Sequence, residues 1–564
     1  MRRLLWATLL LWPALCGAQE PNALISAIFG SPKMLPPTVD ATGRIVVLGS
    51  AITPEGATTN TIDLYAAASD GSSVRRLTRL GGDLRSPSGA NSLALAPDAS
   101  RAAFTMLAPS GGKGGEEVHV LEVATGASRR VAADTEGCIL PLEMVADCPF
   151  CFLTCLYGTH LSPDASKVLY AARRSQPFYV VNADGSGLRR LPVYSGGLAP
   201  SPQRVISRNG LMVFTSSAPL GPTFAAAPAD VYVMNLDGTN IRQVTRFESP
   251  SLYAWNATIS ADGNSIAFES NRDPDRGAAG DTRHIWWVRT DGSGLRPLTA
   301  NVVCLSLDCP RPAPYTSPSI SGDGSLVAFV AGGQVHVARS DRSAVKVVTQ
   351  FRMSAAQDPA LSENTSTVVF GLGPRNGAQG AIYGVNSDGT NLRPVYAPRA
   401  LNPDGVTSAV PGAAPSPGSL ISAYGLNLAP DGLATATRFP LPEVLADVSL
   451  LVNGIPAPLL AVTPWQVNAQ LPPEVPAGPA AFQLRFRDGT QGVAVATNVQ
   501  SVAPAIFLLS ATANQAAVLH GNTHLPVDRD HPAVAGEVVE IYGTGLGPTD
   551  PFVPAGTPAP ASPP

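Results

Sequence analysis

The chain has 564 residues, of which 45% are hydrophobic and 14% are charged, and its formal net charge is −4. This length exceeds what one hydrophobic core usually holds, so several domains or one large repeat array are expected. The hydrophobic content excludes a disordered chain, and the small net charge gives no electrostatic reason to expect nucleic acid or an anionic membrane as a partner.

The N-terminus reads as an export signal. Arg2 and Arg3 precede the apolar run Leu4–Leu15, and Cys16-Gly17-Ala18 supplies small residues for cleavage after Ala18. An alternative is a lipoprotein with Cys16 as the lipidated residue. No later stretch approaches the ~20 apolar residues of a transmembrane helix. We therefore expect residues 1–18 to be a signal peptide and the mature protein to be periplasmic, on the cell surface or extracellular.

A repeated pattern of paired β-hairpins follows. In segment 259–299, Asp262-Gly263 and Asp291-Gly292 each separate apolar runs, and Asp-Gly there predicts a tight turn because both residues tolerate positive φ. The pattern S-x-D-G-x-x-I-A-F, followed by I-Y-V-x-x-x-D-G-S-x-L-R-x-L-T, recurs in seven copies. Their first halves are Val39–Leu48, Leu95–Phe104, Leu161–Tyr170, Ile206–Phe214, Ile259–Phe268, Ile320–Phe329 and Leu361–Phe370.

Four short strands per repeat are typical of a β-propeller, in which neighbouring sheets bury faces that one small sheet cannot bury alone. We expect an all-β protein in which residues 19–396 form seven blades, or six if the weak first copy only closes the ring. A parallel solenoid is the alternative, although it would not need two hairpins per unit. These residues resemble the TolB-like propeller repeats of exported bacterial proteins over Val39 to Tyr396. That resemblance implies protein–protein contact at the cell envelope.

The topology sorts the loops between two faces. If the strands of each blade are named a to d, the a–b and c–d connections are the tight turns and share one face. The b–c and d–a connections share the other, which we call the long-loop face. The longest insertions fall there: Ser216–Ala229, Asn271–Asp281, Pro374–Gly380, Ala132–Gly158 and Ala300–Thr316. Variable loops on a rigid scaffold commonly carry function, so we expect the ligand or partner on this face.

One of these loops supplies the candidate binding residues Arg272, Asp273, Asp275, Arg276 and Asp281. Its three aspartates could indicate calcium. The interleaved arginines favour a solvated, self-neutralised loop instead. We therefore expect no metal and no cofactor.

Six cysteines remain after the signal peptide, and an even number in an exported protein predicts disulfides. They are Cys138, Cys148, Cys151, Cys155, Cys304 and Cys309. Cys304–Cys309 is the simplest pair, and the other four allow three connectivities. A redox C-x-x-C at Cys148 and Cys151 lacks the βαβ context such motifs need, and zinc binding with His160 is disfavoured by an oxidising compartment.

The histidines make a thin case for a metal-dependent lyase. His119 and His336 occupy the strand-c position that elsewhere holds tyrosine or tryptophan, which predicts packing within the blade. His160 and His284 remain. The chain contains no G-x-S-x-G nucleophile elbow, which argues against the serine peptidase domain that follows many such propellers.

The C-terminal third reads as a Pro/Ala-rich linker (397–417), an immunoglobulin-like β-domain (418–515) and a partial second module with a Pro-rich tail (516–564). Pro417–Pro430 is echoed by Ala535–Pro548 at an offset of 118 residues, about one immunoglobulin-like sandwich. Val452–Gly454, Thr463–Asn468 and Ile541–Gly547 resemble an IPT/TIG-type module of exported proteins from soil bacteria. The strands that should complete the second copy are missing. Truncation at Pro564 is one reading; otherwise Val538–Tyr542 completes the first sandwich or pairs with another molecule.

Together these features predict a non-enzymatic secreted or envelope-associated protein that binds a polysaccharide or a protein with its long-loop face. A propeller-type polysaccharide lyase or glycosidase is the first alternative, and it would need a metal or carboxylate cluster at the axial channel. A structural cell-surface adhesin is the second. Fold alone does not choose among them.

Overall fold

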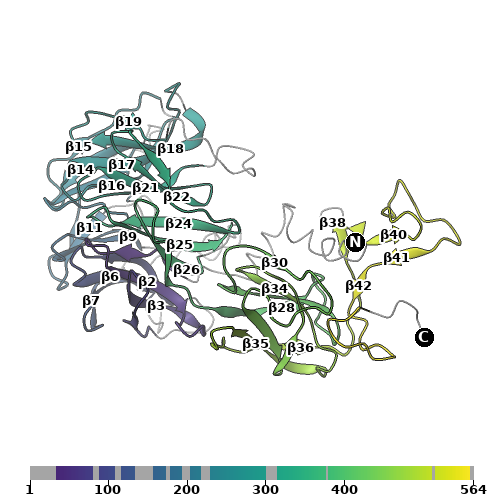
Figure 1. Cartoon of the computed structure of the whole chain (residues 1–564). Coiled ribbons are helices and arrows are strands. Elements are labelled where there is room, and N and C mark those ends of the chain that lie inside the picture. Colours follow the sequence, from purple (N-terminus) through teal and green to yellow (C-terminus); the bar gives the residue numbers. More distant parts are fainter. Residues whose placement is uncertain are drawn as a thin grey trace, which may run out of the picture.

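The computed structural model describes residues 34–80, 88–107, 116–133, 156–172, 178–193, 198, 203–217, 229–249, 251–277, 279–299, 314–375, 379–510 and 515–558. All regular secondary structure in these ranges is β. They include no helix that is long and apolar enough to cross a membrane. Figure 1 shows the purple-to-teal strands gathered in one body, the green strands beside it, and the yellow C-terminal strands beyond.

The first body is a series of antiparallel sheets whose strands follow chain order. The first sheet has two four-stranded parts, which are joined by a short parallel pairing between β3 and β5, and the sheet of β13 has three strands. The strands are β1 (Thr38–Val39), β2 (Ile45–Ile52), β3 (Thr58–Ala68), β4 (Val74–Arg76), β5 (Ser88–Leu95), β6 (Arg101–Leu107), β7 (Glu116–Glu122), β8 (Ser128–Ala133), β9 (Leu156–Leu161), β10 (Lys167–Ala172), β11 (Phe178–Asn182), β12 (Arg189–Arg190), β13 (Leu211–Ser216), β14 (Asp230–Asn235), β15 (Arg242–Gln243), β16 (Ala254–Ile259), β17 (Ser265–Arg272), β18 (Ala279–Arg289), β19 (Arg296–Pro297), β20 (Thr316–Ile320), β21 (Leu326–Ala331), β22 (Gln334–Arg339), β23 (Val345–Val347), β24 (Ser354–Leu361), β25 (Thr367–Pro374), β26 (Ala381–Asn386) and β27 (Arg393–Tyr396).

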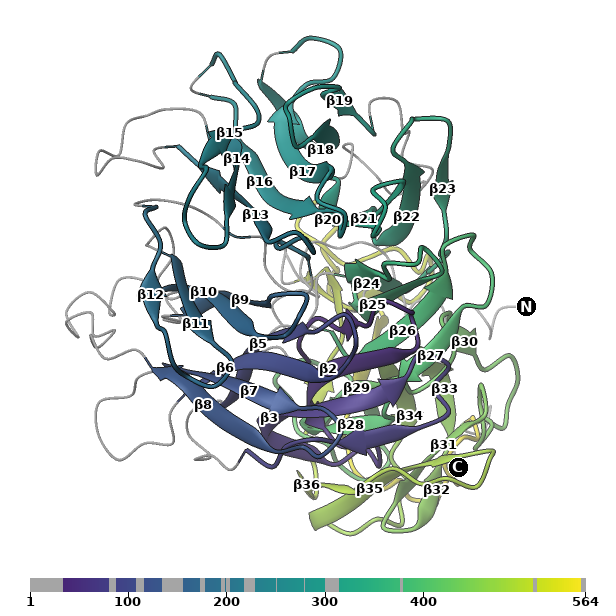
Figure 2. The ribbon, with the colours of Figure 1, turned by 90° about the vertical axis from the view of Figure 1, so that its left-hand side faces the viewer.

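These sheets close into a ring, which makes the body a β-propeller. First strands of neighbouring sheets pack against one another, as β16 does on β20 and β20 on β24, and β24 also contacts β1. Figure 2 shows the sheets arranged around a common centre. At the seam, Asn364 donates to Ala41 and Thr42 through its backbone and side-chain amides, and Arg393 donates to the carbonyl of Ser69. Leu48 and Tyr65 pack there in one apolar cluster with residues of β25 and β26.

The S-x-D-G motif is a self-contained turn. The Ser260 hydroxyl donates to the Asp262 carboxylate and accepts the N–H of Ser265 at 3.0 Å. Gly263 has a φ of +77°, a conformation that glycine adopts without steric cost. Equivalent serine contacts occur at Ser162, Ser207, Ser321 and Ser362. The motif therefore has a structural role.

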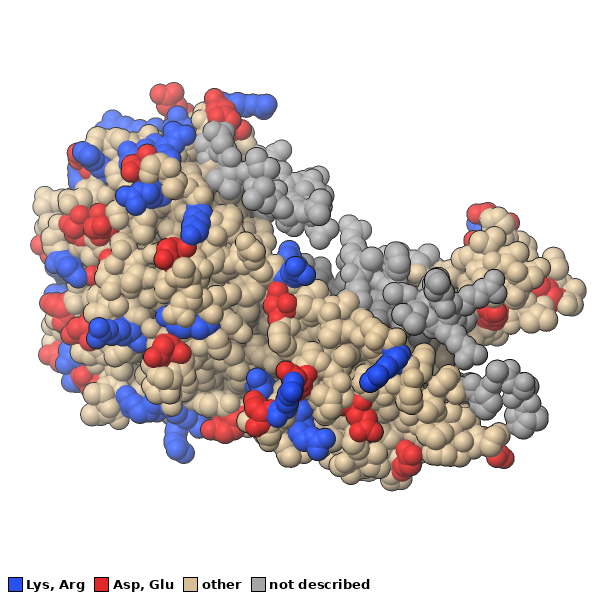
Figure 3. All heavy atoms as spheres, in the orientation of Figure 1, with Lys and Arg blue, Asp and Glu red and all other residues tan. Residues whose placement is uncertain are grey.

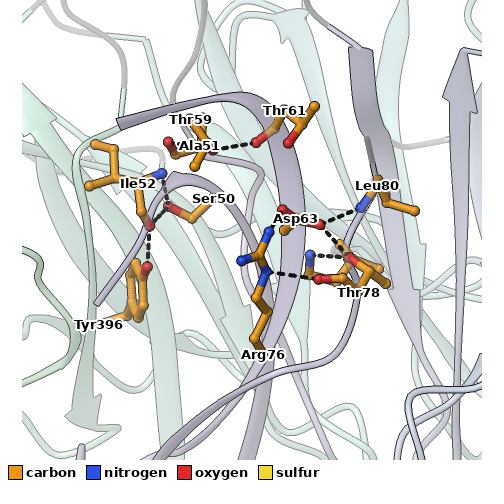
Figure 4. Close-up of polar contacts among 11 residues, drawn as sticks. Ser50, Ala51, Ile52, Thr59, Thr61, Asp63, Arg76, Thr78, Leu80 and Tyr396 are labelled. Carbon is orange, nitrogen blue, oxygen red and sulfur yellow. Dashed lines mark hydrogen bonds and ion pairs between the residues drawn. The ribbon is translucent and has the colours of Figure 1, made fainter. Parts of the chain in front are cut away.

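The threonine that ends the second half-motif joins strand d to strand c. Thr78 accepts the N–H of Leu64 at 2.9 Å and donates to Asp63 at 3.0 Å. Asp63 also accepts the N–H of Leu80 at 2.8 Å and pairs with Arg76, and Figure 4 shows Thr78, Leu80 and Arg76 gathered around this carboxylate. The threonine bond recurs at Thr245, Thr299 and Thr349, at 2.9 to 3.1 Å. These polar residues hold the outer strand of each sheet in place.

The expected column of flat side chains is confirmed as packing. His119 pairs across the strands with Phe104, and their rings stack with centroids 5.3 Å apart. His336 stacks on Phe329 at 5.4 Å in the same register. Tyrosine takes this place in the sheets of β10, β13 and β25.

A β-sandwich follows the propeller. One sheet has the order β28-β29-β34-β33-β30 and the other β32-β31-β35-β36, and their apolar faces share one core. The strands are β28 (Ala400–Ser408), β29 (Leu420–Leu426), β30 (Ala434–Thr435), β31 (Val448–Val452), β32 (Ile455–Ala457), β33 (Leu459–Val462), β34 (Gln466–Gln470), β35 (Gly478–Phe486) and β36 (Val495–Val499). The expected linker 397–417 needs correction, because β28 lies inside it and pairs with β29. Its Leu401 and Val406 are buried in the sandwich core on either side of a break in strand register, so no alternating pattern marked the strand among the prolines and alanines.

Beyond the sandwich, three short two-stranded sheets pair β37 (Ala505–Ile506) with β42 (Gly543–Thr544), β38 (Leu508–Ser510) with β39 (Gln515–Ala516), and β40 (Val518–His520) with β41 (Val539–Ile541). Segment Val538–Tyr542 thus pairs through β41 with β40, and it does not complete the first sandwich. Several large apolar side chains here are exposed, Val538 at 75% and Leu546 at 78%.

The sandwich is fastened to the propeller on both sides of the ring seam. The Asp431 carboxylate accepts the backbone N–H groups of residues 352–354 and the hydroxyl of Ser354 at 2.7 Å, at the start of β24. Asn427 donates to the carbonyl of Gly380, just before β26. Across the seam, Ile52 at the end of β2 packs with Trp465 and other sandwich residues.

Candidate functional site

The candidate loop residues lie on the long-loop face, at the b–c connection between β17 and β18. Asp273 accepts the N–H groups of Asp275 and Arg276, each at 2.9 Å, and these bonds lower the pKa of its carboxyl. Arg272 lies over the ring of Trp286, 5.3 Å from its centroid. The side chain of Asp281 and all six cysteines fall outside the described residues. In the ranges that are described, no group of three or more His, Cys, Asp or Glu residues could hold a metal ion.

A buried acid, Glu269 of β17, organises the axial end of this face. Its carboxylate is fully buried and accepts hydrogen bonds from Asn256 of β16 at 2.7 Å, Arg283 of β18 at 2.7 Å and the N–H of Ser317 of β20 at 2.9 Å. Two sheets thus meet at one carboxylate. The ion pair with Arg283 offsets the cost of burying the charge.

A second acid, the partly buried Asp358 of β24, is linked to the first through Ser317. The Ser317 hydroxyl donates to Asp358 at 3.2 Å, and Gln379 donates to its other oxygen at 2.8 Å. Burial raises the pKa of the Asp358 carboxyl, and the nearby charge of Glu269 adds to that rise. The Asp358 carboxyl therefore keeps its proton to a higher pH than a free aspartate does.

Three residues of this network share an unusual backbone. Asn256, Ser317 and Asp358 occupy the same place in β16, β20 and β24, each at a break in strand register, and have φ of +46°, +55° and +44°. Left-handed non-glycine residues store strain, and such residues cluster at functional sites. At these bulges Ser317 contacts Glu269 and Asp358 of the two neighbouring sheets, whereas Asn256 bonds Glu269 within its own sheet.

An aromatic pair lies next to the acids. β16 runs from the d–a loop toward the Asp262-Gly263 turn, so Tyr253 and Trp255 lie at its long-loop end. Both are half-buried and meet edge to face, and the Arg283 guanidinium lies 5.7 Å from the centre of the Trp255 ring. We call Tyr253, Trp255, Asn256, Glu269, Arg283, Ser317, Asp358 and Gln379 the channel-mouth cluster.

The propeller axis itself is narrow. A cavity of about 80 Å³ lies between the inner strands toward the short-turn end, with Gln203, Arg204 and Glu363 among its lining residues. Arg204 and Arg208 both pair with Glu363 there. Pockets that hold a drug-sized ligand usually measure ~300 to 1,000 Å³, so this space is too small for a sugar ring with its substituents.

A larger cleft of about 990 Å³ lies between the propeller and the sandwich. Tyr383, Tyr396 and Trp465 contribute to its apolar lining, and Arg399 pairs with Asp488 at 3.0 Å while lying over the ring of Phe486. This cleft follows the junction of the two domains.

The remaining histidines do not converge on one site. His160 lines the axial cavity. His284, on β18, lies 3.3 Å from the hydroxyl of Thr299, and burial lowers the pKa of the His284 ring. Figure 3 shows lysine and arginine side chains alternating with aspartate and glutamate over the propeller.

Sequence reasoning missed Glu269 and Asp358. The sequence contains a weak signal for this network. Asn256, Ser317 and Asp358 are polar residues at one repeat position, three residues before the apolar end of an inner strand.

No family model matches the chain, and no curated protein matches its sequence. Solved structures similar to it include TolB from Acinetobacter baumannii, with 16% identity, a TM-score of 0.31, and coverage of 65% of each chain. The β-propeller domain of the Trilobed protease from Pyrococcus furiosus has 12% identity and a TM-score of 0.40, over 64% of this chain and 95% of that one. An oligogalacturonate lyase from Vibrio parahaemolyticus has 11% identity and a TM-score of 0.38, over 66% and 93%.

These neighbours share propeller architecture and differ in activity. At such TM-scores their likeness carries no functional argument. The propeller assignment rests on the strand order and the ring closure described above.

Proposed function

We propose that this chain is a non-enzymatic, exported binding protein whose long-loop face binds a polysaccharide or a protein at the envelope or outside the cell. The observation that carries the proposal is the channel-mouth cluster, in which a half-buried aromatic pair lies beside a buried, hydrogen-bonded acid and its arginine. Aromatic rings next to fixed polar groups suit the apolar faces and hydroxyls of sugars as well as protein side chains.

The buried acids favour binding over catalysis. Glu269 accepts three hydrogen bonds, and the one from Arg283 is also an ion pair, so its carboxylate oxygens are already engaged. Within this proposal the propeller has seven blades, the sandwich is immunoglobulin-like, residues 1–18 direct export, and the six cysteines form disulfides.

The test is co-sedimentation with insoluble plant and microbial polysaccharides, with released sugar ends assayed in the same tubes, using the chain from Gln19 onward. Trp255→Ala should abolish sedimentation. Leu188→Ala, which alters an exposed apolar side chain beside the c–d turn of another sheet, should not. Circular dichroism confirms that both variants fold. If no polysaccharide sediments the protein, photo-crosslinking from position 255 to envelope proteins tests a protein partner.

A propeller-type lyase or glycosidase is the second candidate, favoured by the raised pKa of Asp358 beside Glu269. Released sugar ends would move the assignment to this class. In that case Asp358→Asn should remove product formation while sedimentation persists.

A further inference from the structure

The axial cavity is lined by groups that the proposed function does not use. The inner strands supply His160, Ser319 and the segment Gln203–Ile206, and the turn after β24 supplies Glu363. The hydroxyl of Ser319 accepts the N–H of Leu361 at 3.0 Å, so its role there is structural. The remaining polar groups are concentrated on Gln203 and Arg204.

Gln203 is buried and Arg204 is partly buried, and both have unmet hydrogen-bonding capacity. Gln203 is 2% exposed, and neither its amide nitrogen nor its amide oxygen has a partner. Nη1 of Arg204 also has none, although Nη2 of the same guanidinium lies 3.1 Å from the carboxylate of Glu363. Buried polar groups are nearly always satisfied, so these atoms indicate a bound species at the axis.

The charges around the cavity favour an anion. One carboxylate, Glu363, is shared by two guanidinium groups, Arg204 and Arg208. The other nearby acid, Asp262, is engaged by Ser260 and Asn264 in its own turn. One positive charge therefore remains without a dedicated partner. The Arg208 side chain is 62% exposed, so water solvates its charge, whereas the buried Nη1 of Arg204 has no acceptor, which an anion in the cavity can supply.

The position of Arg204 is fixed by the fold. Its backbone carbonyl accepts the N–H of Ile259 and the hydroxyl of Thr258, each at 2.9 Å, so the segment is held against β16 of the next sheet. The donors are thus preorganised. A volume of about 80 Å³ accommodates a few atoms beyond one water, whose share of the liquid is ~30 Å³.

We propose that the axial cavity binds one small free anion, an inorganic oxyanion, a halide or formate, through Arg204 and Gln203. The bound anion supplies the missing acceptor for Nη1 of Arg204 and for the amide nitrogen of Gln203. This site is separate from the channel-mouth cluster and does not depend on its function.

The test measures the thermal midpoint of the full chain in a buffer whose only anion is a bulky sulfonate. Sodium salts of nitrate, phosphate, bromide and formate are then added at constant ionic strength. A site that binds only the native state gives a rise in Tm that saturates with concentration. Gln203→Leu should raise the half-saturating concentration about tenfold, as expected for losing one buried hydrogen bond. Arg189→Gln, an exposed arginine elsewhere on the propeller, should leave it unchanged.

Arg204→Gln combined with Glu363→Gln removes the buried ion pair as a unit and should abolish saturation. Crystals soaked in bromide provide a readout that does not depend on stability, with an anomalous peak expected between Arg204 and Gln203. A wild-type protein without saturation and without a bromide peak would show that water alone fills the cavity, which would overturn the proposal. A rise in Tm that still saturates in the double variant would also overturn the proposal.

Discussion

Replacing Asp431 by alanine tests whether the sandwich stabilises the propeller. The carboxylate accepts the N–H of Met353 at 3.1 Å, the N–H of Ser354 at 3.0 Å and the Ser354 hydroxyl at 2.7 Å. Ser354 is fully buried, so its two bonds cannot be replaced by water. Hydrogen bonds to a charged group contribute ~1.5–3 kcal/mol each, and half-exposure of Asp431 reduces this, which gives a loss of about 2–4 kcal/mol.

The assay is urea denaturation followed by tryptophan fluorescence and circular dichroism. The midpoint of the propeller transition should fall in Asp431→Ala, and Asp431→Asn should recover part of the loss because its amide oxygen still accepts. Asp404→Ala is the matched control, since Asp404 is exposed on β28. Surface substitutions of that kind change stability by ~0.5 kcal/mol or less. An Asp431→Ala value no larger than the control would refute the reasoning.

Three further outcomes follow from the contacts described. Thr245→Val should lower the free energy of unfolding, measured by urea denaturation, by about 2–4 kcal/mol, because the buried N–H of Val231 and the buried carboxylate of Asp230 both lose their bond to the Thr245 hydroxyl. Thr239→Val, in an exposed turn, is the control. Equal losses in the two variants would contradict the argument. Asp358→Asn should raise Tm at neutral pH. Because the pKa of Asp358 is raised in the folded state, its titration destabilises the fold increasingly as pH rises from the unfolded pKa of ~3.9 to the folded pKa, so the advantage should vanish below pH ~4. The turn aspartates have lowered pKa values because the serine or threonine two residues later donates hydrogen bonds to each carboxylate. Their contribution to the stability of the fold is complete above the unfolded pKa of ~3.9 and is lost as pH falls through the folded pKa. Tm should therefore fall in acid, and a Tm constant to pH 2 would contradict this.

The sequence predicted the local structure well because the repeat motif acts within a few residues. Asp262-Gly263 forms a turn whatever lies across the axis, and the match between His119 and the tyrosines of other repeats showed that it packs within a blade. The linker was mispredicted because prolines and alanines masked the buried pair Leu401 and Val406.

The candidate site could be predicted only in part. The long-loop face follows from strand order, but the contact between Glu269 and Ser317 joins residues 48 positions apart, through side chains of ordinary spacing. Asp431 lies in Pro430-Asp431-Gly432, which reads as a simple turn, and its bonds to residues 352–354 exist only after both domains have folded. Such contacts depend on tertiary geometry that no local pattern records.

The seam of the ring sets the order in which the molecule can assemble. Within the described residues, no strand pairs the first sheet with the last, and bonds that cross the seam, such as those from Asn364 to Thr42 and from Arg393 to Ser69, join residues 322 and 324 positions apart. The entropic cost of closing so long a loop grows slowly, by ~0.6 kcal/mol per doubling of length. The residues on both sides of the seam must nevertheless be synthesised before it can close. An open crescent, with Leu48 and Tyr65 uncovered, therefore precedes the closed ring during synthesis. The sandwich, made last, then fastens both sides of the opening, so a chain that stopped at residue 396 would close into a ring that reopens more often.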